Sequence, residues 1–299
     1  MALGRRRQRT GTTRIVRGSR LRPGGTARVV FLLLYLGFLL LPLYWVAITS
    51  IKPQEDLLTD PPTWWPAHPT GLHYSTALNA FRGREGLENS LVIAFATTAL
   101  AVVLGTAAAY SMARFRTGGK HLAFWFLSQR IMPPIAIIIP VFLLYSRYTD
   151  EWIGVSLVDT KVGLILLYTA FALPFTVWMM FAYFRQMPVE LEEAALVDGA
   201  HRGKAVWYVV LPLALPGLIA AAIFTFILAW NDFLFALVLI SSEELKTLPV
   251  GVNDLFNATI VDWGLIMAAG VMITVPTVVF FAAVQRYLVE GWTAGGVKG

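Results

Sequence analysis

The sequence contains no cysteine among its 299 residues. This absence excludes disulfide bonds and thiol chemistry and leaves the redox compartment undetermined. Charged residues are scarce as well, at 14% of the chain, against about 25% in soluble domains. The one GGK stretch, at residues 118–120, has Arg114 where the first glycine of a phosphate-binding loop would stand. The chain is therefore not expected to bind ATP in the P-loop manner.

Signals for catalysis and for metal binding are missing too. The four histidines, at positions 68, 73, 121 and 201, show no metal-ligand spacing. The apolar segments hold no Ser/His/Asp set, no HExxH motif and no carboxylate pair. We expect no catalytic residue, no metal site and no cofactor of the chain's own, so the protein is not predicted to be an enzyme.

Long apolar segments dominate what is present. Hydrophobic residues make up 57% of the chain, and the mean hydropathy is +0.65. Six segments approach the ~20 residues that a helix needs to cross the hydrocarbon layer. They are residues 29–50, 89–113, 122–146, 162–184, 209–231 and 264–285. The sequence thus predicts an all-α polytopic membrane protein with six transmembrane helices and no large soluble module.

Basic residues predict the orientation of these spans. The arm at residues 1–28 holds nine arginines, and the loops after the second and fourth spans are richer in Lys and Arg than the alternate loops. By the positive-inside rule, both termini are cytoplasmic, around a six-span domain at 29–287 and a tail at 288–299. We interpret the arm as a topogenic anchor rather than a site for RNA or anionic lipid. The net charge of +6 then requires no nucleic-acid partner.

Two spans carry polar residues inside apolar sequence. Arg130 lies in the third span, where Pro133 and Pro134 are expected to kink or interrupt the helix. Asn231 and Asp232 lie toward the outer end of the fifth span. Each set has two interpretations: a place on a solute path, or a structural role, with Arg130 reaching the headgroups and the Asn-Asp pair acting as a polar hinge. Their different depths disfavour an ion pair between Arg130 and Asp232.

A short acidic helix is predicted between the fourth and fifth spans, over 188–199. Pro188 suits its first turn, three glutamates stand near its positive dipole end, and Gly199 is placed to end it in left-handed geometry. We predict that Leu191, Ala194 and Ala195 pack on the protein's own spans. Val189, Leu196 and Val197 then form an outer stripe with Glu193 at its centre. A carboxylate there suits a groove that contains a cation; the alternative is a solvated connecting helix.

The stretch that contains this helix resembles the EAA loop of permease subunits of binding-protein-dependent ABC importers. Val209 stands where isoleucine is usual in the motif. By this resemblance, the residues that couple to the ATPase subunit are Glu193, Ala194, Ala195, Asp198, Gly199, Leu211 and Pro212. Three further stretches, NSLVIAFATTALAVVLGTAAAYSMARF, AWNDFLFAL and TAGGVKG, resemble the smaller six-span permease of maltose-type sugar transporters.

The resemblance implies a type I ABC importer permease fold in the bacterial cytoplasmic membrane. It implies as partners a second, homologous permease, two copies of an ATPase subunit that bind ATP and Mg²⁺, and an extracytoplasmic solute-binding protein. The outer loop at 241–262 would reach that binding protein. The tail would reach the ATPase interface through Thr293, Gly295, Gly296 and Lys298.

The substrate class stays open between sugars or polyols and a non-sugar solute such as glycerol phosphate. An ion-coupled secondary transporter is the main rival from another class, because such proteins place ionisable residues at the membrane midplane. Arg130 and Asp232 are the only candidates for that role, and neither is convincingly central. A membrane-embedded enzyme is the second rival. Transport or hydrolysis by the purified chain without an ATPase subunit distinguishes both rivals from an importer subunit.

Overall fold

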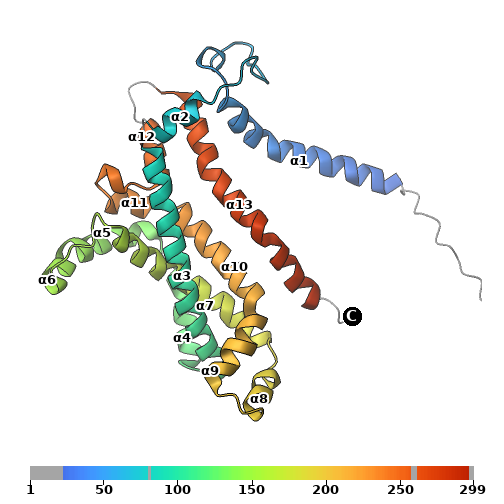
Figure 1. Cartoon of the computed structure of the whole chain (residues 1–299), viewed down its shortest axis with the longest axis vertical. Coiled ribbons are helices and arrows are strands. Elements are labelled where there is room, and N and C mark those ends of the chain that lie inside the picture. Colours follow the sequence, from blue (N-terminus) through green and yellow to red (C-terminus); the bar gives the residue numbers. More distant parts are fainter. Residues whose placement is uncertain (1–22, 80–81, 257–260, 296–299) are drawn as a thin grey trace, which may run out of the picture. The chain divides into compact units, whose positions relative to one another are not determined.

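The computed structural model describes residues 23–79, 82–256 and 261–295, apart from the side chains of 23–25, 130, 153, 284 and 286–295. The described residues form helices and connecting turns, with no β-strand among them. Residues 1–45 and 46–299 form two separate units, so each is described by itself (Figure 1).

The helices follow one another in this order. They are α1 (Pro23–Thr49), α2 (Leu72–Asn79), α3 (Gly83–Phe115), α4 (Gly119–Ser128), α5 (Pro134–Leu143), α6 (Thr149–Ile153), α7 (Lys161–Gln186), α8 (Glu190–Val197), α9 (Arg202–Ala205), α10 (Leu211–Trp230), α11 (Leu234–Leu239), α12 (Leu248–Phe256) and α13 (Trp263–Gly295). Three 3₁₀ turns, η1 (Gln54–Asp56), η2 (Gln129–Ile131) and η5 (Glu243–Leu245), and two π-helical segments, η3 (Leu144–Tyr148) and η4 (Val206–Val210), complete the set.

The first unit consists of the basic arm and most of α1. The apolar part of this helix, Thr26–Thr49, has 24 residues with a hydropathy of 2.4. At ~1.5 Å per residue it is long enough to cross a bilayer, as predicted for residues 29–50.

The second unit is a bundle in which α3 packs against α7 and α10, and α10 packs in turn against α13 (Figure 1). Small residues permit the close approach of α3 to α7, since a Cβ added at Gly105 would lie 2.7 Å from Cγ2 of Thr176. The hydroxyls of Thr176 and Thr225 lie 3.1 Å apart and link α7 to α10. The indole of Trp230 donates to the carbonyl of Ile273, 3.0 Å away, and links α10 to α13.

Within the described residues, five helices are long and apolar enough to span a membrane. The third predicted span, residues 122–146, is not one of them, because it is divided into α4, η2, α5 and η3. The break lies at Met132 and Pro133, both with extended backbone, and confirms the predicted interruption. Its cause is local: proline cannot donate a helical hydrogen bond, and the residue before a proline is disfavoured in helical geometry.

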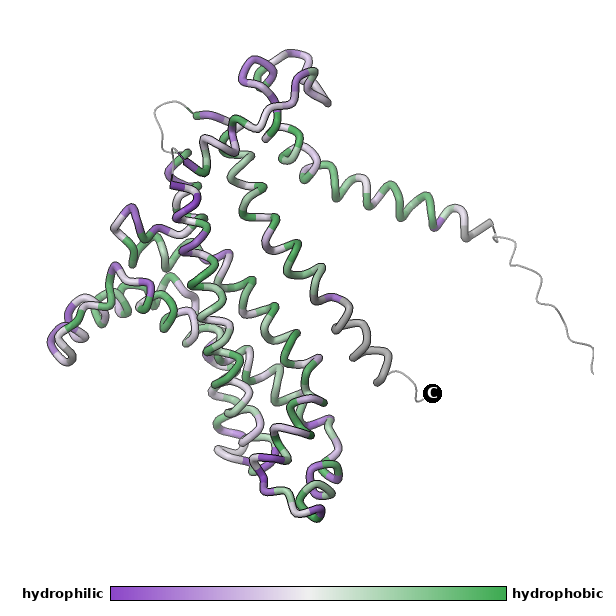
Figure 2. Tube along the Cα trace, in the orientation of Figure 1, coloured by the Kyte–Doolittle hydropathy of each residue, from purple (hydrophilic) through white to green (hydrophobic). Residues whose placement is uncertain are grey.

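Hydropathy divides the second unit into zones along its helices (Figure 2). The long helices are apolar through their middle. Hydrophilic residues collect at one end around α8 and α9, and at the other end around α2 and the start of α3. This banding is the pattern expected of a bilayer-spanning bundle, and the two polar ends carry the features described next.

Candidate functional site

The acidic helix predicted over 188–199 is present as α8, Glu190–Val197. Its end is a Schellman motif: the amide of Ala200 donates to the carbonyl of Ala195 (3.0 Å) and the amide of Gly199 to that of Leu196 (3.1 Å). Gly199 has φ +85° and open space where a Cβ would stand. The predicted left-handed termination at Gly199 is therefore confirmed.

A buried ion pair attaches α8 to the bundle. Nε of Arg114, at the end of α3, lies 3.1 Å from Oε2 of Glu192, and their side chains are only 7% and 8% exposed. The hydroxyl of Tyr110, one turn earlier on α3, donates to Oε1 of the same carboxylate. Both oxygens of Glu192 are thus engaged, which a buried carboxylate requires.

The same guanidinium also holds the end of α7. It donates to the carbonyl of Phe184 (3.2 Å) and to the carbonyl of Met187 (3.3 Å). These carbonyls belong to the last turn and the C-cap of α7, where a helix leaves acceptors without intrahelical partners. One arginine therefore fixes α3, α7 and α8 to one another, and the ring of Phe184 packs edge-on against Tyr110 beside it.

The exposed face of α8 differs in part from the predicted one. Leu191 is 45% exposed and Ala194 is exposed, so the prediction that they pack on the protein's own spans is wrong. The inward face is centred on Glu192 because its ion pair fixes the rotation of the helix. Glu193 is exposed, with Val189 and Val197 exposed around it, as predicted for the outer stripe, whereas Leu196 of that stripe is partly buried.

The remaining motif residues lie around this helix. Ala195 is partly buried, and Asp198 is the exposed C-cap of α8. Leu211 and Pro212 open α10, where a missing N–H is tolerated in the first turn. In the predicted tail, Thr293 and Gly295 belong to the backbone of α13, so the helix continues past residue 287. Gly296 and Lys298 lie outside the described residues.

A cavity of about 690 Å³ lies where two of the apolar segments are interrupted. Gln129 and Met132 line it at the break between α4 and α5, and Asp232 lines it at the break between α10 and α11. From α7, Tyr168 and Phe171 complete this side. Non-helical backbone at membrane depth is tolerated where it lines a cavity, so the two breaks and the cavity have one explanation.

The structure places the three predicted path residues differently. Asp232 is partly buried in the cavity wall, and its Oδ2 accepts from the Tyr168 hydroxyl (2.6 Å) and from the amides of Phe235 (3.2 Å) and Ala236 (3.3 Å). Asn231 is exposed and donates to the carbonyl of Ile227 in its own helix (2.9 Å). The backbone of Arg130 lies in η2 beside the cavity, while its side chain lies outside the described part of the structure.

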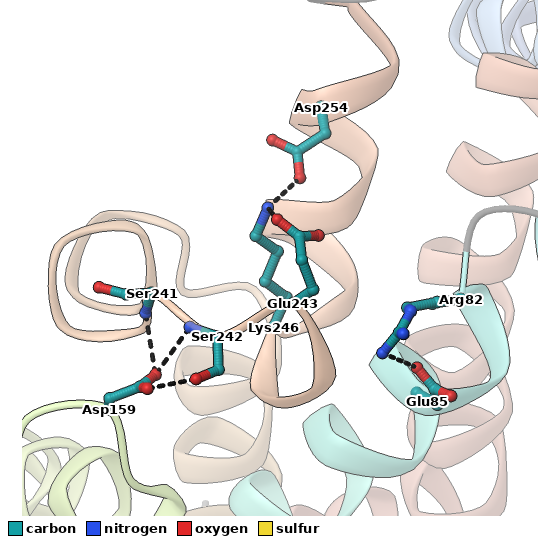
Figure 3. Close-up of polar contacts among 8 residues, drawn as sticks. All are labelled: Arg82, Glu85, Asp159, Ser241, Ser242, Glu243, Lys246 and Asp254. Atoms are coloured by element: carbon teal, nitrogen blue, oxygen red, sulfur yellow. Dashed lines mark hydrogen bonds and ion pairs between the residues drawn. The ribbon is translucent and has the colours of Figure 1, made fainter.

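A second polar cluster holds the segment that follows α11 (Figure 3). Oδ1 of Asp159 accepts from the amides of Ser241 and Ser242, each at 2.9 Å, and Oδ2 accepts from the Ser242 hydroxyl. These bonds to Ser242 and Ser241 outweigh partial burial and hold the pKa of Asp159 below its ordinary value. Together they fasten the loop before α7 to the outer segment.

The same segment is also fastened to the start of α3. The side-chain amide of Asn89 donates to the carbonyls of Glu244 (2.8 Å) and Lys246 (3.0 Å). Lys246 in turn contacts Glu243 and Asp254 (Figure 3). Burial lowers the pKa of Lys246, but the hydrogen bonds to these two carboxylates outweigh it and leave the pKa raised. The part of the predicted outer loop at 257–260 lies outside the described residues.

Three of these anchoring residues were missed by sequence reasoning. Arg114 was counted as a topogenic charge, Glu192 as one of three dipole-end glutamates, and Asp159 was given no role. Their partners lie 78 and 83 residues away in the chain. The one available signal was the place of Arg114 at the very end of an apolar segment, where a guanidinium reaches carbonyls and carboxylates at the membrane surface.

Among the described residues, no three His, Asp or Glu side chains gather as a metal would require. The described residues do form three features. Helix α8 is held by an ion pair at one polar end, a cavity lies at the breaks in two apolar segments, and the segment at 241–242 is hydrogen-bonded to Asp159 at the other polar end.

Residues 101–293, more than half of the chain, match the family model described as "Binding-protein-dependent transport system inner membrane component". The chain belongs to this family. It is a permease subunit of an ABC importer and a multi-pass protein of the cytoplasmic membrane, which confirms the predicted resemblance and fold class.

Two relatives are similar over almost their whole length. The trehalose transport system permease protein SugB of Mycobacterium tuberculosis is 38% identical, over 89% of this chain and 95% of the relative. The diacetylchitobiose uptake system permease protein DasC of Streptomyces coelicolor is 32% identical, over 91% and 96%. These family members are transport subunits rather than enzymes.

A solved structure supports the same fold for this family member. It is a bacterial ABC transporter involved in the import of the acidic polysaccharide alginate. A chain of it matches with a TM-score of 0.75 and 21% identity, over 88% of this chain and 96% of that chain. Membership of the family implies, in general terms, a partner permease, an ATPase and a solute-binding protein.

The buried ion pair yields a first prediction. Glu192→Ala leaves Arg114 buried without its carboxylate, and removing one partner of a buried pair costs roughly 3–5 kcal/mol. We expect a lower melting temperature and faster amide exchange in α8 for the permease purified without its ATPase subunit. Glu193→Ala, which alters the exposed neighbour, is the matched control and should leave both unchanged. Equal behaviour of the two variants would show that the pair does not fix α8.

Gly199 yields a second prediction. A β-branched residue at φ +85° costs roughly 1 kcal/mol or more in backbone strain, whereas asparagine tolerates this region. Since no neighbour blocks a side chain there, only the turn should be affected. We expect Gly199→Val to lower the amount of solute transported per ATP hydrolysed in proteoliposomes, and Gly199→Asn to retain it. Wild-type stoichiometry in the valine variant would contradict this expectation.

Asp159 yields a third prediction, on pH. Because its pKa is lowered in the folded protein, its bonds contribute stability above the unfolded pKa of about 3.9, and this contribution is lost as the pH falls through the folded pKa. Exchange of the Ser241 and Ser242 amides, corrected for intrinsic rates, should stay slow from neutral pH down to about pH 5. Asp159→Ala should accelerate it about fivefold or more, the equivalent of ~1 kcal/mol. Unchanged exchange in that variant would contradict the proposed fastening.

Proposed function

We propose that this chain forms half of the translocation path of an ATP-driven importer for a sugar, namely an oligosaccharide, a disaccharide or a polyol. A second, homologous permease supplies the other half, two copies of an ATPase subunit bind ATP and Mg²⁺, and an extracytoplasmic solute-binding protein delivers the solute. The observation that carries the proposal is α8, clamped on its inner face by Arg114 and Glu192 and free on the face that presents Glu193.

The mechanism that fits this geometry is alternating access. ATP binding closes the two ATPase subunits and moves the helix seated on them. In this chain α8 does not move alone, because Arg114 ties it to the ends of α3 and α7. A displacement of α8 is therefore applied to the two helices that pack most closely in the bundle, and through α7 to the cavity wall at Tyr168.

The sugar assignment rests on two observations. The relatives named for trehalose and diacetylchitobiose uptake align over about nine-tenths of this chain. The lining of the cavity includes several aromatic rings, among them Trp125, Phe171 and Phe235, whose faces suit the C–H faces of a sugar. A fold shared with other importers does not by itself define a solute, so the relatives and the cavity lining carry this step together.

The exposed carboxylate of Glu193 tests the coupling role. In the docked complex it is expected to pair with a basic residue of the ATPase subunit, and breaking such a pair costs several kcal/mol. Glu193→Ala should therefore reduce ATPase activity stimulated by the loaded binding protein tenfold or more, with the permease still folded and inserted. Full stimulation in this variant would refute the pairing.

The substrate class is tested directly by isolating the solute-binding protein that associates with this permease. Mass spectrometry of the solute it carries, followed by uptake of that solute into proteoliposomes, should identify a carbohydrate. An amino acid, a metal or a phosphate ester carried and transported in its place would overturn the sugar assignment.

A further inference from the structure

The charge of the cavity wall limits what the cavity accepts. Of the described residues that line it, Asp232 is the only charged one. The others are aromatic, aliphatic or neutral polar side chains, with Gln129 and Tyr168 as the amide and the phenol. A fixed carboxylate a few ångströms from a bound anion, at an effective dielectric of about 20, disfavours that anion by about a hundredfold.

The hydrogen bonds that hold the carboxylate of Asp232 all engage the same one of its two oxygens. The hydrogen bonds from the Tyr168 hydroxyl and from the amides of Phe235 and Ala236 all end on Oδ2. By accepting from the amides of Phe235 and Ala236, the carboxylate caps the start of α11, and it keeps acceptor capacity on Oδ1 for hydroxyl groups. A rigid acceptor in an apolar surround is a strong partner for a neutral donor.

A second acceptor lies nearby on α7. Pro174 has no N–H, so it cannot satisfy the carbonyl of Ala170 four residues earlier, and both residues line the cavity. The lining of the cavity thus combines the carboxylate oxygens of Asp232 with aromatic residues that include Phe171 and Phe175. Acceptors combined with ring faces match a molecule with many hydroxyl groups and apolar C–H faces, and the volume of about 690 Å³ falls within the range of small-molecule sites.

We infer that this cavity is a solute site of this permease and that it selects uncharged, polyhydroxylated solutes of up to disaccharide size over anionic ones. The inference rests on the proposed function and narrows its substrate class: it excludes glycerol phosphate, which the sequence left open, and also acidic sugars. Asp232 is the selecting group, because its charge repels anions while its oxygen accepts from hydroxyls.

The lack of cysteine in the chain permits a test that does not depend on transport. Ala170, a small exposed residue in the lining, is replaced by cysteine in the purified importer complex. Cationic and anionic methanethiosulfonates of similar size then compete for it, and the mass of this chain reports the product. We expect the cationic reagent to react at least tenfold faster, relative to the rates of the two reagents with a free thiol.

Three background substitutions make this test specific. Asp232→Asn should abolish the preference, whereas Tyr168→Phe, which keeps the carboxylate, should retain it. Glu244→Gln removes an exposed carboxylate of the outer segment, 78% exposed, and should leave the preference unchanged. A preference that persists in Asp232→Asn, with a melting temperature equal to that of the parent, would overturn the role of Asp232.

Protection by solutes tests the site itself. Millimolar trehalose or maltose should slow the labelling of Cys at position 170, and glycerol 3-phosphate or glucuronate should not. Protection by the anions, lost on Arg130→Gln, would show that the cavity is an anion site and overturn the inference. If the importer takes up a sugar that never slows the labelling, the inference fails and the proposed function stands. If it takes up no carbohydrate, the proposed function fails whatever the labelling shows.

Discussion

A buried charge is tolerated only when it is paired, and in this chain that requirement determines how α8 attaches to the bundle. Arg114 and Glu192 are each more than nine-tenths buried, so separating them is strongly unfavourable. Because the guanidinium also donates hydrogen bonds to the last carbonyls of α7, a rotation of α8 would disturb the ends of two long helices. An isolated helix of eight residues would be marginal in water. The ion pair, and not helix propensity, holds α8 in a fixed position against α3 and α7.

The interior of the bundle is subject to a different constraint, because polar groups at membrane depth are costly when they lack partners. The chain interrupts two apolar segments, at Pro133 and at Asn231, and places the freed polar groups against one cavity. At the second break Asp232 caps α11, so the carboxylate that faces the cavity also stabilises the new helix start. The two interpretations of Asp232 left open by the sequence, path residue and structural hinge, are therefore compatible.

Local chemistry made some of these features predictable from sequence. Gly199 was recognised because few residues other than glycine adopt a positive φ readily, and Pro133 with Pro134 because proline interrupts any helix. Hydropathy predicted the long helices. The inner face of α8 was predicted wrongly, since two apolar stripes compete on its surface and a buried ion pair to a residue 78 positions away decides between them. The contact between Asp159 and Ser242, 83 positions apart, was likewise beyond any local pattern.

One helix connects the two functional ends. Helix α7 carries the Met187 carbonyl bound by Arg114 at its cytoplasmic end and Tyr168 at the cavity, about 28 Å apart along its axis at ~1.5 Å per residue. Between them lies Pro174, where the missing hydrogen bond to Ala170 permits bending. Gly105 and Thr176 keep α3 in close contact just beyond this point, so the cytoplasmic half of α7 moves with α3. We propose that a displacement of α8 bends α7 at Pro174, beside the cavity wall, and so changes access to the proposed solute site.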